Sequence, residues 1–398
     1  MKKIIVSYSD KFGGAAKSAY RIFQCLRKYD NSLEMIVVKK ISNDKNITAP
    51  LKKTEIFFVK IKNYLCILLS KFFSQNPVSF NIFNSSLLKY INKENYSFIN
   101  LHWINAETLS VSDISNIKRP VILTLHDMWY FTGIENYILD KSKYWKYNEK
   151  VENNKKISNF FLEKKLSKWK NLHIITPSNW MKEEAKKSKL MSDFKIEVIP
   201  YPINLEIYKP NTFLEKNFNK SYRILFSAFG RLQEKRKGFD LLVQSLNMLS
   251  KTNIDFTLVT IGSNLKNNLE YNFKIENLGF IEKDEELVKI YNSVDVVTIP
   301  SRLDNLPNVG LEAHACGKPI VAYNIGGLPD IVEHNKTGFL TKPFDVEMFY
   351  QNIKNLLINQ NLKNHFSKNA RAKAVEEWSS EKIFQKYKKY FDEIKVYS

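Results

Sequence analysis

Residues 294–329, VDVVTIPSRLDNLPNVGLEAHACGKPIVAYNIGGLP, contain the pattern that decides the fold. The apolar, β-branched run at 294–299 is typical of a buried parallel strand. The apolar spacing after Asn308 predicts a helix that ends at Gly317, and a second strand is predicted at 319–323. The segment therefore predicts a strand, loop, helix and strand of an open α/β sheet, which binds its ligands at the carboxyl ends of its strands.

Two carboxylates stand eight positions apart in this segment, Asp304 in the loop and Glu312 near the start of the helix. An ionised carboxylate accepts two hydroxyl donors at once, so the pair suits a polyhydroxylated ligand. The helix N-terminus and the pair Gly326 and Gly327 add backbone N–H groups for a phosphate. Sugar hydroxyls beside a diphosphate indicate a nucleotide sugar. Taken alone, the two acids are also typical of a solvated loop and of a helix N-terminus.

The loop at residues 229–238, FGRLQEKRKG, comes after another apolar run and precedes an apolar helix pattern. Arg231 and Lys237 stand six positions apart in it. A guanidinium binds phosphate through paired hydrogen bonds and an ammonium acts as a point charge, so the two suit a diphosphate. They would neutralise a nucleoside diphosphate that leaves during bond cleavage. Basic residues exposed on a loop are the plainer alternative.

The first half of the chain offers two further candidate features. Residues 3–8 predict a buried strand that leads into Gly13 and Gly14 at the start of a helix. This turn can cradle a phosphate, although it is neither a GxGxxG nor a P-loop sequence, and close packing of small residues is the alternative. Two more apolar runs end in His102 and His126, which places both histidines on the ligand side of a parallel sheet, although a structural role is the alternative for each.

The pattern of residues 304–329 resembles the donor-site signature of family 4 glycosyltransferases of GT-B fold. Asp304 and Glu312 match its acid, seven residues and Glu, and the sequences ACGKPI and GGLP match the remainder of the signature. Asp304 stands where Glu is commoner, which shortens the side chain by one methylene. Residues 124–133, TLHDMWYFTG, resemble a bacterial subgroup that makes surface polysaccharides, and the chain departs from that subgroup after Gly133.

The resemblance implies an α/β protein of GT-B fold, with two Rossmann-like domains that face one another across a cleft. We expect residues 1–203 to form the acceptor-side domain and residues 204–377 to form the domain that binds the nucleotide sugar. Three prolines within eleven residues, at 200–210, favour extended chain at this boundary. The C-terminal helix, residues 378–398, is expected to cross back to the first domain.

The implied activity is transfer of a hexosyl or N-acetylhexosaminyl group from a nucleotide-diphosphate sugar to a hydroxyl of a saccharide or lipid-linked saccharide. The resemblance implies retention of anomeric configuration and a place in the synthesis of capsule, lipopolysaccharide or another surface polysaccharide. The chain has no Asp-x-Asp sequence, so no metal and no cofactor besides the donor substrate is expected. Two rivals stay open: a nucleotide-sugar epimerase of the same fold, and a non-catalytic protein whose basic surface binds nucleic acid or membrane.

The resemblance also implies roles for individual residues. Glu312 is expected to hold the nucleotide ribose, Asp304 to face the transferred sugar, and His126 to steady that sugar near its anomeric centre. Asp127 is expected either to orient His126 or to approach the acceptor hydroxyl. The expected catalytic set is His126, Arg231, Lys237, Asp304 and Glu312. The other residues expected at the donor are Gly13, Gly14, Gly230, Phe280, Ile281, Asn305, Leu306, Asn308 and Val309, and those expected at the acceptor are His102, Trp103 and Asp127.

Composition limits the class of protein. The chain has 398 residues, more than one typical core, and 44% of them are hydrophobic, which argues against disorder. Its three cysteines lie far apart without metal-ligand spacing, which favours a reducing cytosol, and the first residues do not predict a signal peptide. A formal net charge of +20 suits an anionic partner. We expect a cytoplasmic enzyme, with no nucleic-acid partner.

Two segments are both basic and aromatic. Residues 51–73 mix a dense apolar set with five lysines and a single acid, which is typical either of a helix in a membrane interface or of a packed helix with solvated lysines. Residues 141–170 carry ten lysines against three acids, interleaved with aromatic residues. That composition suits single-stranded nucleic acid, an anionic membrane or a solvated helix face. An anionic membrane surface, at the inner face of the plasma membrane, is therefore an open partner.

Overall fold

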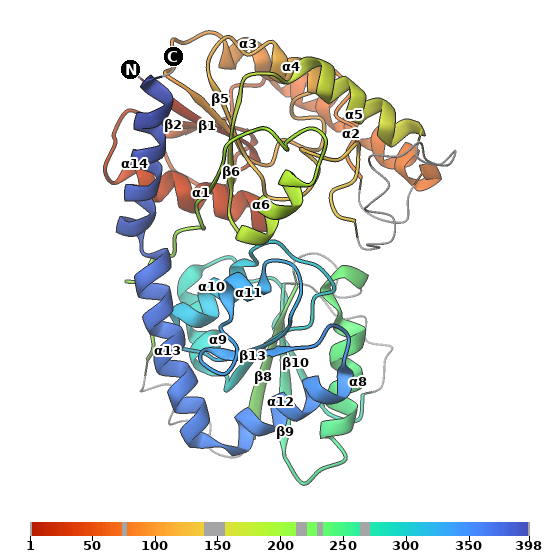
Figure 1. Ribbon diagram of the computed structural model, residues 1–398, viewed down its shortest axis with the longest axis vertical. Helices are drawn as coiled ribbons and strands as arrows, with labels where there is room; N and C mark the ends of the chain where they lie inside the picture. The colour runs from red at the N-terminus through yellow and green to blue at the C-terminus, as the bar shows by residue number, and fades with distance from the viewer. Residues whose placement is uncertain are drawn as a thin grey trace. The chain divides into compact units, whose positions relative to one another are not determined.

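The computed structural model describes residues 2–73, 78–138, 156–211, 221–228, 234–262 and 271–396. The chain forms two compact units, one made of Met1–Pro200 with Phe384–Ser398 and the other of Tyr201–Ile383. Each unit is built around its own parallel sheet, as the ribbon in Figure 1 shows. The first and second units are called unit 1 and unit 2 below.

Unit 1 contains a seven-stranded sheet in which every neighbouring pair is parallel, in the order β3-β2-β1-β4-β5-β6-β7. Its central strands are almost fully buried, because helices cover both faces of a parallel sheet and apolar residues fill both sides of each strand. The strands are β1 (Lys3–Ser9), β2 (Leu33–Lys39), β3 (Ile47–Thr48), β4 (Ile99–Leu101), β5 (Val121–Thr124), β6 (Leu172–Thr176) and β7 (Ile196–Val198).

Side-chain caps mark the starts of α6 and α4 in unit 1. Ser178 accepts a hydrogen bond from the Met181 N–H at the start of α6, and Ser110 and Asp113 cap α4 reciprocally. Gly13, with φ of 94°, stands at the N-cap of α1. The helices are α1 (Gly14–Arg27), α2 (Lys53–Phe73), α3 (Leu87–Ile91), α4 (Val111–Ser115), α5 (Lys156–Lys168) and α6 (Asn179–Lys186).

Unit 2 contains a six-stranded parallel sheet in the order β10-β9-β8-β11-β12-β13. Its strands are β8 (Tyr222–Ser227), β9 (Phe256–Ile261), β10 (Lys274–Asn277), β11 (Val296–Ile299), β12 (Ile320–Tyr323) and β13 (Gly338–Thr341). The strand, loop, helix and strand predicted for residues 294–329 are present as β11, α10 and β12, with β11 beginning two residues later than the apolar run. The run begins early because Val294 packs in the core before the ladder starts.

The helices of unit 2 include a short 3-10 turn, η4 (Lys235–Lys237), directly before α8 (Phe239–Leu249). One core cluster joins α8 and α12 to the sheet through side chains such as Leu246, Leu258 and Ile353, all fully buried. The remaining helices are α9 (Asp284–Asn292), α10 (Asn308–Ala315), α11 (Leu328–Ile331), α12 (Val346–Ile358) and α13 (Gln360–Trp378).

The last helix, α14 (Ser380–Val396), returns the chain to unit 1. Phe384 stacks on Tyr29, just after α1, with ring centroids 4.1 Å apart. Phe391 packs on Phe98 at 4.3 Å, and the Tyr390 hydroxyl donates to the Ile174 carbonyl at 3.2 Å. The predicted C-terminal helix that crosses back to the first domain is therefore confirmed.

Candidate functional site

In unit 2 the loop after β11 is fastened to η4, so the predicted acid loop and the predicted basic loop lie together. The Arg302 N–H donates to the Arg236 carbonyl at 2.7 Å, and the Arg302 guanidinium donates to the Lys235 carbonyl at 2.8 Å. The same guanidinium forms a two-point ion pair with Asp240 of α8, at 2.7 and 2.6 Å. These bonds hold the charged side chains of both loops in one place.

Asp304 is the centre of this cluster. Its carboxylate accepts a hydrogen bond from Lys237 Nζ at 2.7 Å and lies 3.3 Å from the Arg236 guanidinium. Ser301 Oγ and the Asn305 N–H also donate to it, at 3.3 and 3.2 Å. Burial alone would raise the pKa of Asp304, but the charges of Lys237 and Arg236 and these hydrogen bonds hold it below its ordinary value. Asp304 is therefore a carboxylate, ready to accept hydroxyl donors.

Two glycines let the backbone approach closely around this cluster. Gly326 has φ of 61°, and a Cβ placed on it would overlap the carbonyl oxygen of Asp304. The N–H of the next residue, Gly327, donates to that same carbonyl at 2.9 Å. Gly238, with φ of 70°, likewise leaves no room for a Cβ beside the carbonyl of Pro300. The glycines therefore fix the position of the acid loop.

Glu312 lies on α10 and is only 4% exposed. The Tyr291 hydroxyl of α9 donates to its Oε2 at 2.6 Å. Burial, and then the Glu312 charge, raise the pKa of Tyr291 well above its ordinary value, so the phenol keeps its proton and remains a donor. The same two causes raise the pKa of the Cys316 thiol to about 12. Glu312 is thus held by a neutral partner.

The other residues predicted at the donor lie in three places. Asn305 and Leu306 are buried directly after Asp304, and Asn308 and Val309 form the first turn of α10, half-buried. Phe280 is 54% exposed, and Ile281 beside it is half-buried, in the loop between β10 and α9. Gly230 and Arg231 lie outside the described residues.

In unit 1 the two histidines at the carboxyl ends of β4 and β5 contact each other. Nδ1 of His102 lies 2.8 Å from Nε2 of His126, and both rings are buried. Burial lowers the pKa of His126 to about 3, and burial with the neighbouring ring lowers the pKa of His102 well below its ordinary value. Both rings are therefore neutral at pH 7, and one N–H is shared between them.

The two rings share one hydrogen bond, in which one ring nitrogen donates and the other accepts. The other nitrogen of His102, Nε2, is buried and has no hydrogen-bond partner among the described residues. An unsatisfied nitrogen there costs about 1–3 kcal/mol whether or not it carries the proton. The bond between the rings therefore orients both side chains.

Asp127 is bound by its surroundings and orients the segment beside His126. Its carboxylate accepts hydrogen bonds from Trp103 Nε1 at 3.1 Å, from Asn105 Nδ2 at 3.4 Å and from the Trp129 N–H at 3.1 Å. Trp103 and Asp127, both predicted at the acceptor, are thus in direct contact. Gly13 and Gly14 follow β1, which pairs with β4 in the same sheet, and they stand at the start of α1.

Lys165 of α5 supports the same segment and was missed from the sequence. Its fully buried ammonium donates to the carbonyls of Trp129, Thr132 and Gly133 and lies 3.9 Å from the centre of the Trp129 ring. Burial lowers its pKa well below the ordinary value. Lys165 stands within the basic segment 141–170, and the sequence does not distinguish one buried lysine there from the exposed lysines around it. Residues 141–155 of that segment lie outside the described residues.

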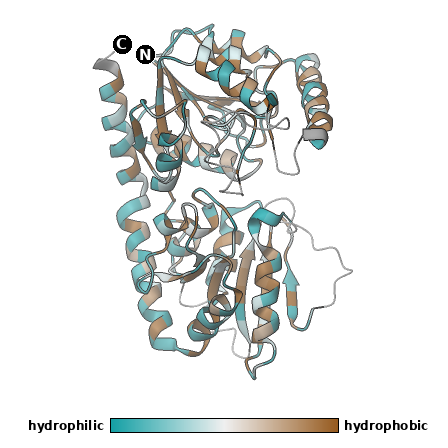
Figure 2. Ribbon diagram, turned by 45° about the vertical axis from the view of Figure 1, so that its right-hand side comes forward, coloured by the Kyte–Doolittle hydropathy of each residue, from teal (hydrophilic) through white to brown (hydrophobic). Residues whose placement is uncertain are grey.

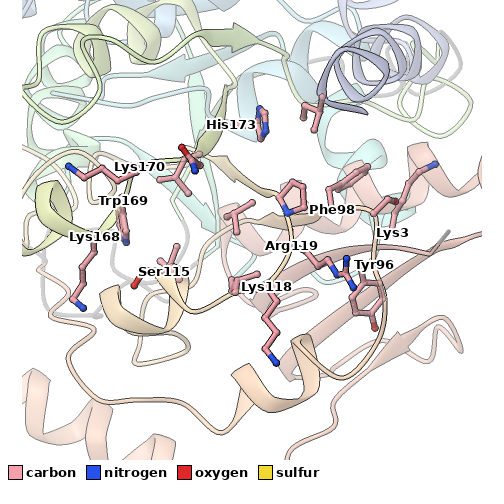
Figure 3. A pocket seen from close by; sticks show the side chains of 18 of the residues that line it. Lys3, Tyr96, Phe98, Ser115, Lys118, Arg119, Lys168, Trp169, Lys170 and His173 are labelled. Carbon is pink, nitrogen blue, oxygen red and sulfur yellow. The ribbon is translucent and has the colours of Figure 1, made fainter. Parts of the chain in front are cut away.

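A wide hollow of about 1050 Å³ opens at the opposite, amino-terminal edge of the same sheet (Figure 3). Lys3, Lys118, Arg119, Lys168 and Lys170 stand around it. Figure 3 shows that their charged ends point away from one another rather than toward one position. None of the predicted site residues lines this hollow. No group of three or more His, Cys, Asp or Glu in the described part of the chain is placed to hold a metal ion.

Comparisons with known proteins match both halves of the chain. Residues 12–207 match the family "Glycosyltransferase Family 4", and residues 210–373 match the family "Glycosyl transferases group 1". The chain belongs to the family 4 glycosyltransferases. The predicted family is therefore confirmed.

Curated relatives of this family 4 glycosyltransferase are matched over part of their length. An uncharacterized glycosyltransferase of Haemophilus influenzae is 32% identical over 212 residues, which are 52% of this chain and 58% of the relative. The capsular polysaccharide biosynthesis glycosyltransferase CapM of Staphylococcus aureus is 24% identical over 245 residues, 58% of this chain and 64% of the relative. The chain thus spans somewhat more than half the length of these relatives.

Solved structures confirm the GT-B fold. The sucrose-phosphate synthase of Thermosynechococcus elongatus superposes with a TM-score of 0.71 at 17% identity, covering 100% of both chains. Anabaena HepE in complex with UDP-glucose superposes with a TM-score of 0.67 at 17% identity, covering 99% of this chain and 100% of that one. At such identities the likeness establishes the fold alone.

Proposed function

We propose that this family 4 glycosyltransferase transfers a sugar from a nucleotide-diphosphate sugar to a hydroxyl of a saccharide or lipid-linked saccharide, with retention and without a metal ion. The observation that carries the proposal is the cluster of Lys237, Arg236 and Asp304 in the same unit as the buried Glu312. Family membership along both halves of the chain supports it.

The cations of the cluster are assigned to the diphosphate. A lysine ammonium has three donors, and Asp304 accepts one of those on Lys237, which leaves two for phosphate oxygens. Arg231 is proposed to bind the same diphosphate in two-point fashion. Together these charges would stabilise the leaving nucleoside diphosphate, the task that a divalent cation performs in other enzymes.

The carboxylates are assigned to hydroxyl groups. Asp304 is ionised near neutral pH because its neighbours lower its pKa, so it accepts hydrogen bonds from hydroxyls of the transferred sugar. Glu312, whose Oε2 is bound by Tyr291, is proposed to accept from the hydroxyls of the nucleotide ribose.

His126 is assigned to the sugar as a neutral hydrogen-bonding group. Its pKa of about 3 excludes a role as a cation at pH 7, so a neutral ring nitrogen would contact the sugar. The acceptor hydroxyl would then attack from the face of the leaving group, with its proton passing to the departing phosphate. Asp127, held by Trp103 and Asn105, keeps the His126 backbone in place.

The acceptor class is proposed from a relative. CapM is named for capsular polysaccharide biosynthesis, and its match covers the larger part of this chain. An acceptor in surface polysaccharide synthesis fits that likeness. HepE was solved with UDP-glucose, which makes a uridine nucleotide the first donor to examine.

A binding and turnover experiment tests the proposal. A thermal-shift screen with UDP, GDP and ADP should show one nucleotide that raises the melting temperature, because a ligand that binds only the native form stabilises it. With the matching nucleotide sugar and an oligosaccharide acceptor, nucleoside diphosphate should be released in step with glycosylated product, in the presence of EDTA as in its absence. Conversion of the sugar without acceptor-dependent release would instead indicate the epimerase.

Arg231→Ala and Lys237→Ala sharpen this test. Each should lower transfer by on the order of a hundredfold, the loss typical of removing one group that stabilises developing charge. The exposed Lys251→Ala is a control outside the proposed site. Near wild-type turnover of both site variants would contradict the assignment, and nucleotide-independent retention of random oligonucleotides without any transfer would favour the non-catalytic rival.

A further inference from the structure

Helix α2 (Lys53–Phe73) exposes most of its large apolar side chains. Of the side chains described between residues 53 and 71, Val59 and Cys66 are buried and the rest are half-buried or exposed. A surface helix ordinarily directs its apolar stripe toward the core. The exposed members here, between 36% and 60% accessible, are Phe57, Phe58, Ile61, Tyr64, Leu65, Ile67, Leu68 and Leu69.

These exposed apolar side chains, called the apolar arc below, lie on the side of α2 opposite to its contact with the rest of unit 1. Val59 and Cys66 are seven residues apart and so share one face of the helix. With about 3.6 residues per turn, Phe57, Tyr64 and Leu68 fall on the face roughly opposite. Apolar stretches recur along α2 in Figure 2, where the helix lies at the edge of unit 1.

A neighbouring helix adds to the exposed apolar set. Phe161 of α5 packs with Cys66 of α2 in a small buried cluster. Phe160, beside it on α5, is 64% exposed. This buried cluster packs one face of α2 against α5. Large apolar side chains on both helices nevertheless remain exposed.

Lysines border the apolar arc of α2. Lys53, Lys60 and Lys71, spaced by seven and eleven residues, are all exposed and fall along one flank of the helix. The helix contains one acid, Glu55, and its charge is paired with Lys89 at 2.6 Å. The flank therefore has a net positive charge, within a chain whose formal net charge is +20.

We propose that α2 docks unit 1 on a bilayer surface that contains anionic lipid, with the helix axis in the plane of the interface. The apolar arc would enter the boundary between headgroups and acyl chains, and Lys53, Lys60 and Lys71 would reach the lipid phosphates. A second copy of this chain is a poorer occupant, because a two-fold contact through the same face would bring two positively charged flanks together.

Vesicle co-sedimentation tests the docking surface without any nucleotide or sugar, so its result is independent of the proposed transfer reaction. The chain should pellet with vesicles of phosphatidylcholine mixed with phosphatidylglycerol and remain in the supernatant with phosphatidylcholine alone. Replacing Lys53, Lys60 and Lys71 by Gln should lower partitioning to anionic vesicles by on the order of a hundredfold, since each lysine near an anionic surface contributes about fivefold.

The apolar contribution is tested with Phe57→Ser, Tyr64→Ser and Leu68→Ser combined. Because these side chains are exposed, the variant should keep the melting temperature of the wild type while it loses vesicle binding. Matched controls in unit 2 are the exposed apolar set Met348→Ser, Ile358→Ser and Val375→Ser and the exposed lysine set Lys251→Gln, Lys368→Gln and Lys382→Gln, which should bind vesicles as the wild type does.

Three outcomes would overturn the proposal. The first is wild-type sedimentation of the α2 variants, and the second is equal binding to neutral and anionic vesicles. The third is a dimer in analytical ultracentrifugation that the α2 serine substitutions dissociate, with no vesicle binding, which would assign the face to a second copy of the chain.

Discussion

Lys237 donates a hydrogen bond of 2.7 Å to the carboxylate of Asp304, which lies 67 positions further along the chain. The contact joins the loop that precedes α8 to the loop after β11. One of these loops is proposed to bind the diphosphate and the other to bind the sugar. The proposed donor site is therefore one charged network, in which a change to either loop alters the electrostatics of the other.

Asp304→Asn should destabilise unit 2. The substitution leaves Lys237 and Arg236 without their shared carboxylate, and the three side chains are only 8–18% exposed. We expect the free energy of unfolding to fall by about 3–5 kcal/mol, the range for breaking a buried pair, as measured by urea denaturation. Transfer should fall as well, because two cations no longer have a fixed position.

The matched control for that variant is Asp240→Asn. Asp240 pairs with Arg302 by two bonds, but its side chain is 55% exposed. Exposed ion pairs contribute about 0–1 kcal/mol. A loss of stability in Asp240→Asn as large as that in Asp304→Asn would show that the burial of the Asp304 cluster has no special effect.

Tyr291→Phe should weaken nucleotide binding. The tyrosine hydroxyl donates to Glu312 at 2.6 Å, and both side chains are buried, so the substitution removes the bond that orients the carboxylate proposed to hold the ribose. We expect the dissociation constant of the matching nucleoside diphosphate, measured by calorimetry, to rise about fivefold, the effect of about 1 kcal/mol. The kcat should change much less.

Tyr208→Phe provides the comparison for Tyr291→Phe. The Tyr208 hydroxyl donates to Asp284 at 2.7 Å, and its ring lies 6.4 Å from that of Tyr291. It has the same chemistry in the same core, but the carboxylate to which it donates, Asp284, is not among the residues of the proposed site. Equal weakening of nucleotide binding in both variants would indicate a general loosening of α9 instead of a role for Tyr291 in positioning Glu312.

Much of the fold was predictable from the sequence because the signals are local. The β-branched run that forms β11 and the apolar spacing of α10 depend on a few neighbouring residues, and so does the Ser178 cap of α6. The same patterns placed both histidines at the carboxyl ends of strands. The positions of His102 and His126 therefore agree with the expected edge of the sheet.

The contacts within the candidate site were not predictable in the same way. Sequence spacing cannot reveal a bond between Lys237 and Asp304 across 67 residues, and Arg236 looks like one more exposed charge in a basic run. Tyr291 occupies an ordinary apolar position of an amphipathic helix, so its hydroxyl gives no signal. Lys165 is identified by burial alone, which tertiary packing determines.

His102 should affect kcat by orienting the His126 side chain. His102→Leu removes the ring nitrogen that is hydrogen-bonded to His126 Nε2, so His126 loses the bond that orients it and the proposed sugar contact is misaligned. We expect kcat to fall by on the order of ten- to a hundredfold, with the KM of the donor nearly unchanged, in assays of nucleoside diphosphate release. His102→Asn, whose amide supplies a donor near the position of Nδ1, should recover part of the rate. Equal losses in both variants would point to packing instead of orientation.

Buried neutral histidines should make the protein less stable as the pH falls from about 6.5. Burial lowers the pKa of His126 and of His314 to about 3 and lowers the pKa of His102 well below 6.5. Below pH 6.5 the unfolded chain binds protons at these sites and the native state does not, so protonation favours unfolding. His126 and His314 should each lower the free energy of unfolding by about 1.4 kcal/mol per pH unit between roughly pH 6 and pH 3, and His102 acts in the same direction.

His314→Leu isolates one of these groups. His314 is fully buried in unit 2 and stacks on Trp378, so an apolar side chain of similar size suits the site, and the stability at pH 7 should change little. Between pH 6 and pH 5 the variant should lose about 1.4 kcal/mol less stability than the wild type in urea denaturation. The exposed His365→Gln is the matched control. The wild type and this control should show the same pH dependence of stability. If His314→Leu showed it too, protonation of His314 in the unfolded chain would not contribute to acid destabilisation.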